Sequence, residues 1–387
     1  MRRVVLLSTL LATGIPAARQ HRQDDAPWRV DLDRKGEGAP VFRIPALAVT
    51  TRGTLLAAYD ARPTMADVPG HIAVVMRRST DGGRSWSPRY AVRADTAPLG
   101  FGDPSLLVDR VTGRVFAFHV ASVRQGFFGA STGTRDDDPD VLHAEMSWSE
   151  DDGLTWRARR LTSRIKQPGW GGLFAASGAG IQMRTGRLVQ PYVIRRDGET
   201  WAATLLSDDH GETWHMGALV GPGADEHKVV ELDDGTLLLN SRAKPWRLIA
   251  RSRDGGETWT SLVPDTQLPD PANNGSIVRV WPGARRGTGA ARVLAFSNTA
   301  DTAQRANLTL RLSCDDGATW PHARALEPGR AGYSTLVTLP GDTLGVLYER
   351  GAYEAITFAR VPLAWVGRCD RAPRRPPPAT APSRRAP

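Results

Sequence analysis

Three arginines stand in or beside apolar stretches that read as β-strands, where a guanidinium is costly to bury. Arg43 lies within VFRIPALAV, Arg242 ends LLLNSR, and Arg311 lies within LTLRLS. A buried charge needs a partner or a ligand. Three arginines that met at one place would repel one another unless they bound an anion, and a carboxylate or phosphate fits the guanidinium fork. For each arginine taken alone, a structural ion pair is the simpler explanation.

Acidic side chains and one tyrosine are the other candidates for chemistry. Together with a fourth arginine, and spread along the chain, they are Arg62, Asp67, Asp103, Glu226, Tyr333 and Glu349. Each acidic residue also has an ordinary explanation, such as a solvated loop for Asp67, a turn cap for Asp103, and a solvated charge cluster for the run 225–228 around Glu226. Their meaning depends on whether the fold brings them together.

A repeated segment indicates the β-strands and turns that must position these residues. The pattern Ser-x-Asp-x-Gly-x-Ser/Thr-Trp occurs five times, and we call these segments boxes: 79–86, 149–156, 207–214, 252–259 and 313–320. The Asp carboxylate can accept hydrogen bonds from the N–H groups of its own turn, and the Gly can adopt positive φ. The closing Trp offers a large surface that packs the turn down. A strand-like run precedes each box, so we predict a β-hairpin turn at each.

A second repeat alternates with the boxes. A Gly-centred turn followed by a β-rich run, such as RGTLLAAYD, occurs six times, and five of the six are followed by a box. Strand-rich repeats of roughly 40 to 50 residues are typical of propeller blades. We therefore predict an all-β fold, a six-bladed β-propeller with five boxed hairpins. The strands nearest its axis converge, so residues distant in sequence can meet at one end of the central channel.

The composition limits the partners and the compartment. The formal net charge is +9 and the pI is about 10.1, but lysines are few and the arginines are scattered, so we do not expect a nucleic-acid partner. Residues 1–23 resemble a signal peptide and leader, residues 24–370 hold the propeller, and residues 371–387 form a Pro- and Arg-rich tail that we expect to be disordered. We predict a secreted or extracytoplasmic protein without a membrane span.

Two cysteines, Cys314 and Cys369, suit one disulfide in an exported chain, with two free thiols as the alternative. The sequence has no Gly-x-Ser-x-Gly elbow, no Walker loop and no Cys or His cluster with zinc spacing. We therefore expect no metal and no cofactor in the chemistry. Asn274-Gly-Ser matches the N-glycosylation pattern, which matters only if the host glycosylates exported proteins.

The boxes, together with Phe-Arg-Ile-Pro at 42–45, resemble the Asp-boxes and the Arg-Ile-Pro motif of the sialidases, in particular secreted bacterial exo-α-sialidases. The resemblance extends from about residue 28 to residue 366. It implies a retaining hydrolase that removes terminal α-linked sialic acids from oligosaccharides, glycoproteins or glycolipids through a covalent tyrosine intermediate. We expect a monomer.

The resemblance also implies roles for the candidate residues. Arg43, Arg242 and Arg311 look like the arginine triad that holds the carboxylate of sialic acid. Asp67 looks like the acid/base, Tyr333 like the nucleophile and Glu226 like its base. Glu349 looks like the carboxylate that steadies Arg43, and Arg62 and Asp103 match positions around the ring substituents of the sugar.

Three alternatives remain open at this stage. A trans-sialidase, or an intramolecular form that releases an anhydro sugar, would use the same residues. A sialic-acid-binding lectin would be expected to lack Tyr333, Glu226 or Asp67, and all three are present. A purely structural propeller would not need arginines on three separate strands.

Overall fold

The computed structural model describes residues 26–95 and 99–369. Over these residues the chain is built mainly from β-strands, with three short helices: α1 (Thr162–Ile165), α2 (Leu363–Val366) and the 3-10 helix η1 (Ala290–Arg292). In the described part of the chain, no helix is long and apolar enough to cross a membrane. The predicted leader (1–23) and tail (371–387) lie outside the described residues.

Hydrogen bonds join the described strands into five sheets. The first contains β2 (Val41–Val49), β3 (Leu55–Arg62), β4 (Ala73–Ser79) and β5 (Tyr90–Arg93). The second contains β11 (Gly178–Ala179), β6 (Gly100–Val108), β7 (Val115–Ser122), β8 (His143–Ser149) and β9 (Arg157–Arg160). The third contains β10 (Trp170–Ala175), β13 (Leu188–Arg196), β14 (Glu199–Ser207) and β15 (His215–Met216), with β12 (Ile181–Gln182) beside β13. The fourth contains β16 (His227–Glu231), β17 (Leu237–Ser241), β18 (Trp246–Ser252) and β19 (Val263–Pro269).

The fifth sheet has seven strands and is divided by one long strand. Its order is β1 (Trp28–Arg34), β25 (Ala355–Pro362), β24 (Thr343–Arg350), β23 (His322–Leu339), β22 (Ala306–Ser313), β21 (Leu294–Thr299) and β20 (Ser276–Arg279). The first half of β23 pairs with β22 and the second half with β24. Buried side chains from the strands on either side of β23, such as Leu310 of β22 and Val346 of β24, share one core cluster.

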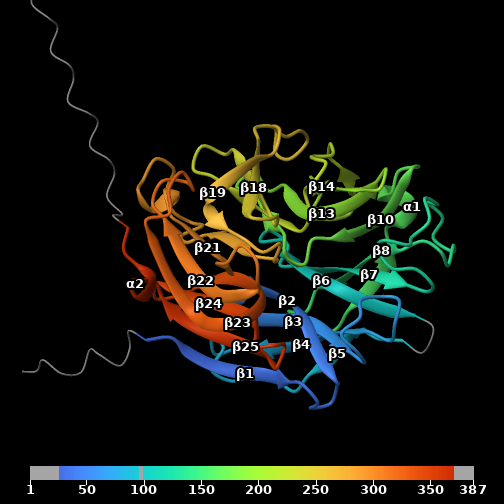
Figure 1. Cartoon of the computed structure of the whole chain (residues 1–387), viewed down its shortest axis with the longest axis horizontal. Helices are drawn as coiled ribbons and strands as arrows, with labels where there is room; N and C mark the ends of the chain where they lie inside the picture. Colours follow the sequence, from blue (N-terminus) through green and yellow to red (C-terminus); the bar gives the residue numbers. More distant parts are fainter. Residues whose placement is uncertain (1–25, 96–98, 370–387) are drawn as a thin grey trace, which may run out of the picture.

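The sheets follow one another around a common centre in chain order. In Figure 1 the colours run once around the molecule, and blue β1 lies beside red β25. The two strands pair antiparallel, so the first described strand closes the ring against the last one. Neighbouring sheets share buried clusters, for example Phe116 of the second sheet with Tyr192 of the third. Burial of apolar faces between successive sheets holds the ring together, and the fold is all-β and propeller-like.

The five boxes have the same internal hydrogen bonds. In each, the Ser hydroxyl donates to the Asp carboxylate and accepts from the N–H of the box Gly. The same carboxylate accepts from the N–H and the hydroxyl of the Ser or Thr four residues later. All five Gly residues have positive φ. Each box lies between two paired antiparallel strands.

Strand register separates the boxes from the candidate site residues. Leu55 pairs with Ser79, where the first box begins, whereas Arg62 lies at the other end of β3. Likewise Leu237 pairs with Ser252 of the fourth box, and Arg242 follows the opposite end of β17. We call these two ends of the sheets the box end and the site end. About six or seven residues of strand, roughly 20 Å, separate them.

Candidate active site

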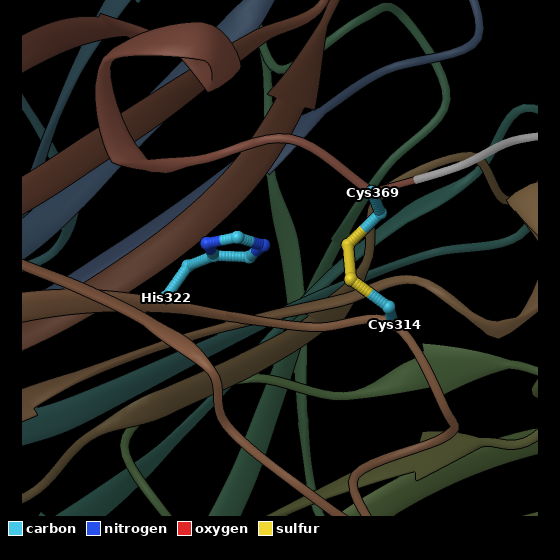
Figure 2. A group of neighbouring side chains, drawn as sticks. All are labelled: Cys314, His322 and Cys369. Carbon is cyan, nitrogen blue, oxygen red and sulfur yellow. A yellow bond between two sulfur atoms is a disulfide. The ribbon is translucent and has the colours of Figure 1, made fainter.

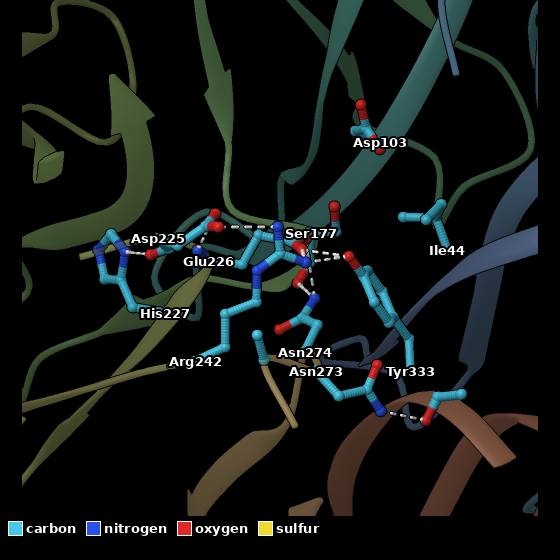
Figure 3. A network of polar contacts seen from close by, with 12 residues as sticks. Ile44, Asp103, Ser177, Asp225, Glu226, His227, Arg242, Asn273, Asn274 and Tyr333 are labelled. Carbon is cyan, nitrogen blue, oxygen red and sulfur yellow. Dashed lines mark hydrogen bonds and ion pairs between the residues drawn. The ribbon is translucent and has the colours of Figure 1, made fainter. Parts of the chain in front are cut away.

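Tyr333, Glu226 and Arg242 meet at the site end. Tyr333 lies in β23, Glu226 directly precedes β16, and Arg242 directly follows β17. The Tyr333 hydroxyl donates to Glu226 Oε2 and accepts from Arg242 Nη1, which also forms an ion pair with Glu226. Arg242 Nη2 donates to Asp225 at 2.9 Å. Figure 3 shows the phenol directed at the Glu226 and Arg242 side chains. A tyrosine between a base and a cation is suited to proton transfer.

Burial and charge act in opposite directions on this group. Burial raises the pKa of the Glu226 carboxyl, but Arg242 and Lys228 outweigh burial, and the pKa lies below its usual value. Burial raises the pKa of the Tyr333 phenol well above its usual value, against the opposing effect of Arg242. The resting state is therefore a carboxylate that accepts a hydrogen bond from a neutral phenol.

Glu349 ties Arg43 to the backbone of Tyr333. Its Oε1 accepts from Arg43 Nε at 3.2 Å and from the N–H of Ile44 at 2.9 Å, and its Oε2 accepts from the N–H of Tyr333 at 2.8 Å. The Glu349 side chain is completely buried, so the ion pair with Arg43 is shielded from water. A Cβ at Gly332 would lie 2.0 Å from Glu349 Oε2, which explains the glycine before Tyr333. The predicted contact between Glu349 and Arg43 is confirmed.

The third arginine beside Tyr333 is Arg305 rather than Arg311. The Arg305 guanidinium lies 5.2 Å from the Tyr333 ring centroid, and those of Arg43 and Arg242 lie 5.5 Å and 5.9 Å from it. Its Nη1 donates to the Tyr353 hydroxyl at 3.2 Å, and the Tyr353 ring lies 4.7 Å from Arg43. All three guanidinium groups thus lie within 6 Å of the phenol ring centroid.

Arg311 is not brought to this group, which corrects the prediction made from its apolar strand. Its Nη1 donates to Asn298 Oδ1 at 2.9 Å, and the nearest charges that affect its pKa are Asp265 and Asp270. Arg305 directly precedes β22. Arg311 lies within β22, six residues later in the chain and about 20 Å closer to the box end. Arg311 therefore has a structural role, through a hydrogen bond to a neutral amide instead of the ion pair that was the simpler explanation.

Arg62 contacts a second set of acidic groups. Its guanidinium is 1% exposed and contacts Asp60 at 2.7 Å, Asp67 at 2.6 Å and Asp103 at 3.9 Å. Burial raises the pKa of Asp60 to about 6, despite the opposing effect of Arg62. Burial, and then the Asp60 charge, raises the pKa of Asp103 to about 8. The Asp67 side chain is 71% exposed, so it stands at the rim of the site.

Three non-glycine residues near these groups have an unfavourable backbone conformation. Ile44, Asp103 and Tyr353 have positive φ values of 60°, 58° and 62°. This conformation is unfavourable for non-glycine residues and most of all for a β-branched one such as Ile44. Strained residues that persist next to charged side chains indicate a functional site.

Sequence reasoning missed four residues of the site: Asp60, Asn274, Arg305 and Tyr353. Asp60 precedes Arg62 by two residues in a strand, which was a readable signal that both side chains lie on one face. Asn274 is 2% exposed and its amide donates to Glu226 Oε1 at 3.1 Å, so its apparent glycosylation motif is inaccessible in the folded protein. Nothing in the sequence around Arg305 or Tyr353 distinguishes them from surface residues.

The predicted disulfide is confirmed and lies apart from this site. Cys314 of the fifth box is bonded to Cys369, and the ring of His322 lies beside the bond (Figure 2). Both sulfur atoms are used in the disulfide, so the three side chains do not offer the thiolates that a zinc site requires.

The comparisons with known proteins agree with this geometry. Residues 45–346 match the model of the BNR repeat-like domain. The chain is 51% identical over 343 residues to a sialidase of Micromonospora viridifaciens, which covers 86% of this chain and 53% of that protein. It is 30% identical to a sialidase of Paraclostridium sordellii over 89% of this chain and 91% of that protein. This chain belongs to the sialidase family.

A solved structure supports the assignment of this sialidase-family chain. The Hadza microbial sialidase Hz136 superposes with a TM-score of 0.78 at 31% identity, over 85% of this chain and 67% of that one. The chain spans about half of the Micromonospora relative, 53% of its length. The site of this family member combines three arginines, an exposed carboxylate and a buried Tyr–Glu pair.

Proposed function

We propose that this sialidase-family chain is a retaining exo-α-sialidase, which removes terminal α-linked sialic acids from oligosaccharides, glycoproteins or glycolipids. The observation that carries the proposal is the Tyr333 hydroxyl, which is held between Glu226 and Arg242, with Arg43, Arg242 and Arg305 close to the phenol ring. Sialic acid carries a carboxylate on its anomeric carbon. A neutral phenol approaches that carbon without the repulsion that an aspartate or glutamate nucleophile would meet.

In the first step, Tyr333 Oη attacks the anomeric carbon while its proton passes to Glu226, and Asp67 protonates the departing glycosidic oxygen. In the second step, Asp67 removes a proton from water, water attacks the same carbon, and Tyr333 leaves and recovers its proton from Glu226. Two inversions give retention of configuration. The exposed position of Asp67 suits a group that must reach both the leaving group and solvent water.

Arg43, Arg242 and Arg305 are proposed to hold the carboxylate of sialic acid. Three guanidinium groups in one place are self-repelling, and an anion relieves that repulsion. Their positive charge also favours the phenolate character that Tyr333 gains during attack. Arg62 and Asp103 are proposed to contact the ring substituents, and this chemistry needs no metal or cofactor.

Two further proposals concern the number of propeller blades and the location of the protein. Counting the two halves of β23 in separate units divides the seven-stranded sheet in two and yields a six-bladed propeller with five boxed hairpins. A disulfide is typical of exported proteins, which supports a secreted or extracytoplasmic location.

The proposal is tested by release of a fluorogenic aglycone from its α-sialoside. The unaltered chain should turn over, Tyr333→Phe should lose at least about 1,000-fold in kcat/KM, and Asp67→Ala should lose much less on this activated substrate than on a natural glycan. Tyr192→Phe, at another fully buried tyrosine, is the matched control and should keep full activity.

Proton NMR of the products distinguishes the related activities. Early accumulation of the α-anomer of free sialic acid supports a retaining hydrolase. Release of an anhydro sugar would indicate an intramolecular trans-sialidase instead of a hydrolase. Transfer of sialic acid to added lactose would indicate a trans-sialidase. Sialic acid binding by a folded protein without turnover would contradict the proposal and leave a lectin.

A further inference from the structure

Lys228 is a buried cation directly beneath the catalytic group proposed above. It lies in β16, two residues after Glu226, and is 2% exposed. Its Nζ donates to Asn274 Oδ1 at 2.7 Å and to the backbone oxygen of His227 at 3.4 Å. A Cβ at Gly178 would lie 2.8 Å from the Lys228 Cε atom, so the glycine makes room for the lysine stem. Burying an ammonium group is costly, and a leucine would fill the space without that cost.

Asn274 connects Lys228 to Glu226. Its Nδ2 donates to Glu226 Oε1 at 3.1 Å and to the backbone oxygen of Ser177 at 2.9 Å. An ammonium group has three donors and no acceptor, so the Asn274 atom that faces it must be the oxygen. The amide nitrogen is then directed at Glu226. Without Lys228 the amide oxygen loses its donor, and only the Ser177 backbone oxygen and Glu226 itself would hold the amide in this orientation.

The charges around Lys228 make Glu226 its main source of stabilisation. The charged groups that affect its pKa are Glu226, which favours the ammonium form, and Arg247 and Arg242, which oppose it. Lys228 also lines a cavity of about 400 Å³, whose walls include the apolar side chains of Leu106, Val229 and Leu336. Attraction between two groups is reciprocal, so the lysine that depends on Glu226 also favours ionised Glu226.

We propose that Lys228, acting through Asn274, is a positioning residue that keeps Glu226 ionised and directed at the Tyr333 hydroxyl. This inference rests on the proposed function, because it concerns the proton acceptor of that reaction. The groups that face Glu226 are Arg242, Lys228 and Tyr333, with Asp103 further off. Arg242 is also proposed to bind the substrate carboxylate, which leaves Lys228 as the cation that serves Glu226 alone.

The titration of Lys228 agrees with this arrangement. Burial lowers the pKa of Lys228 to about 7, against the opposing attraction of Glu226. The ammonium form therefore predominates in acidic solution and is lost as the pH rises through about 7. Removal of its charge should raise the pKa of Glu226 and so move the acidic limb of the pH profile.

The test measures kcat/KM as a function of pH for the unaltered chain, for Lys228→Met, for Asn274→Ala and for the double variant. We expect Lys228→Met to reduce kcat roughly tenfold with little change in KM, and to move the acidic limb upward by about one pH unit. Lys166→Met is the matched control, because Lys166 is also buried, at 4% exposure, and donates to the Ser131 backbone oxygen. It should leave the pH profile unchanged.

The double variant tests the connection through Asn274. If Lys228 acts through Asn274, the double variant loses no more activity than the more impaired single variant. Strictly additive losses would overturn the connection, and an unmoved acidic limb in both active single variants would overturn the role of Lys228. A loss of thermal stability without a change in the pH profile would show a structural role instead. An inactive unaltered chain would overturn the proposed function itself.

Discussion

The box end and the site end of the same strands use acidic residues in opposite ways. At the box end the carboxylates are exposed and bond to their own turns. Slight burial of Asp254 raises its pKa, but hydrogen bonds from Thr258 outweigh that effect and lower the pKa to about 2. At the site end, burial raises the pKa of Asp103 to about 8. The box carboxylates stabilise the fold as anions, whereas ionised Asp103 costs stability.

The two ends also differ in where the partners come from. A box Asp bonds to residues no more than four positions away. Glu349 bonds to Ile44, 305 residues away, and the Tyr333 hydroxyl bonds to Glu226, 107 residues away. The hydrogen bonds of the box Asp residues are therefore local to each turn, whereas the site end is one coupled group. Substitutions should be nearly additive at the first and strongly coupled at the second.

Among the substitutions that compare the two ends, the largest effect is expected from Glu349→Gln, which removes the charge opposite Arg43 and weakens the hold on Tyr333. We expect the free energy of unfolding to fall by about 3 kcal/mol, because a buried guanidinium loses its partner. We expect kcat/KM to fall by at least about 100-fold, because the nucleophile is displaced. Urea unfolding and steady-state kinetics measure the two effects.

Glu212→Gln in the third box is the control for Glu349→Gln. Glu212 is 63% exposed and pairs with Arg114, so its loss should cost less than about 1 kcal/mol and leave kcat/KM unchanged. Equal losses in the two variants would remove the distinction between the ends of the molecule.

The next largest effect is expected from a comparison of Arg305, which directly precedes β22, with Arg311, which lies within β22. Arg305→Gln should raise KM for an α-sialoside by about 100-fold, because one guanidinium partner of the substrate carboxylate is lost. Arg311→Gln should leave KM unchanged and lower the free energy of unfolding by about 1 to 3 kcal/mol, because Asn298 loses a buried hydrogen bond. The opposite pattern would restore Arg311 to the triad.

A smaller effect concerns the pH dependence of stability at the site end. The pKa of Asp103 is raised to about 8 in the folded protein, so its contribution is fully favourable below about pH 4 and is lost as the pH rises to 8. Asp103→Asn should remove this decline, so the free energy of unfolding of the variant should rise relative to that of the unaltered chain between pH 4 and pH 8. Urea unfolding across this range measures the slope, and an unchanged slope would contradict the raised pKa.

The smallest effect, of opposite sign, is expected at the box end. Asp254→Ala should lower the free energy of unfolding by about 0.5 to 1 kcal/mol at pH 7, because the turn loses its acceptor. The pKa of Asp254 is lowered to about 2, so its contribution exists above pH 4 and is lost as the pH falls towards 2. Thermal unfolding at pH 7 and pH 2 should show the difference only at pH 7, with kcat unchanged. An equal difference at both pH values would contradict this account.

The sequence alone determined the features that depend on neighbours along the chain. The boxes could be predicted because Ser, Asp, Gly and Thr complete their hydrogen bonds within one turn. The all-β class followed from strand-like runs between those turns. Tyr333, Glu226, Arg43 and Glu349 were found because their surrounding residues resemble a known pattern.

Only the tertiary structure decided which distant side chains share the site. Arg305 and Arg311 are six residues apart, and the choice between them depends on where β22 begins and on which end of the sheet faces the phenol. Asn274 and Lys228 looked like a surface motif and a solvated charge, yet both are buried against Glu226. Their environments arise from contacts between sheets, and the spacing of residues along one chain does not contain that information.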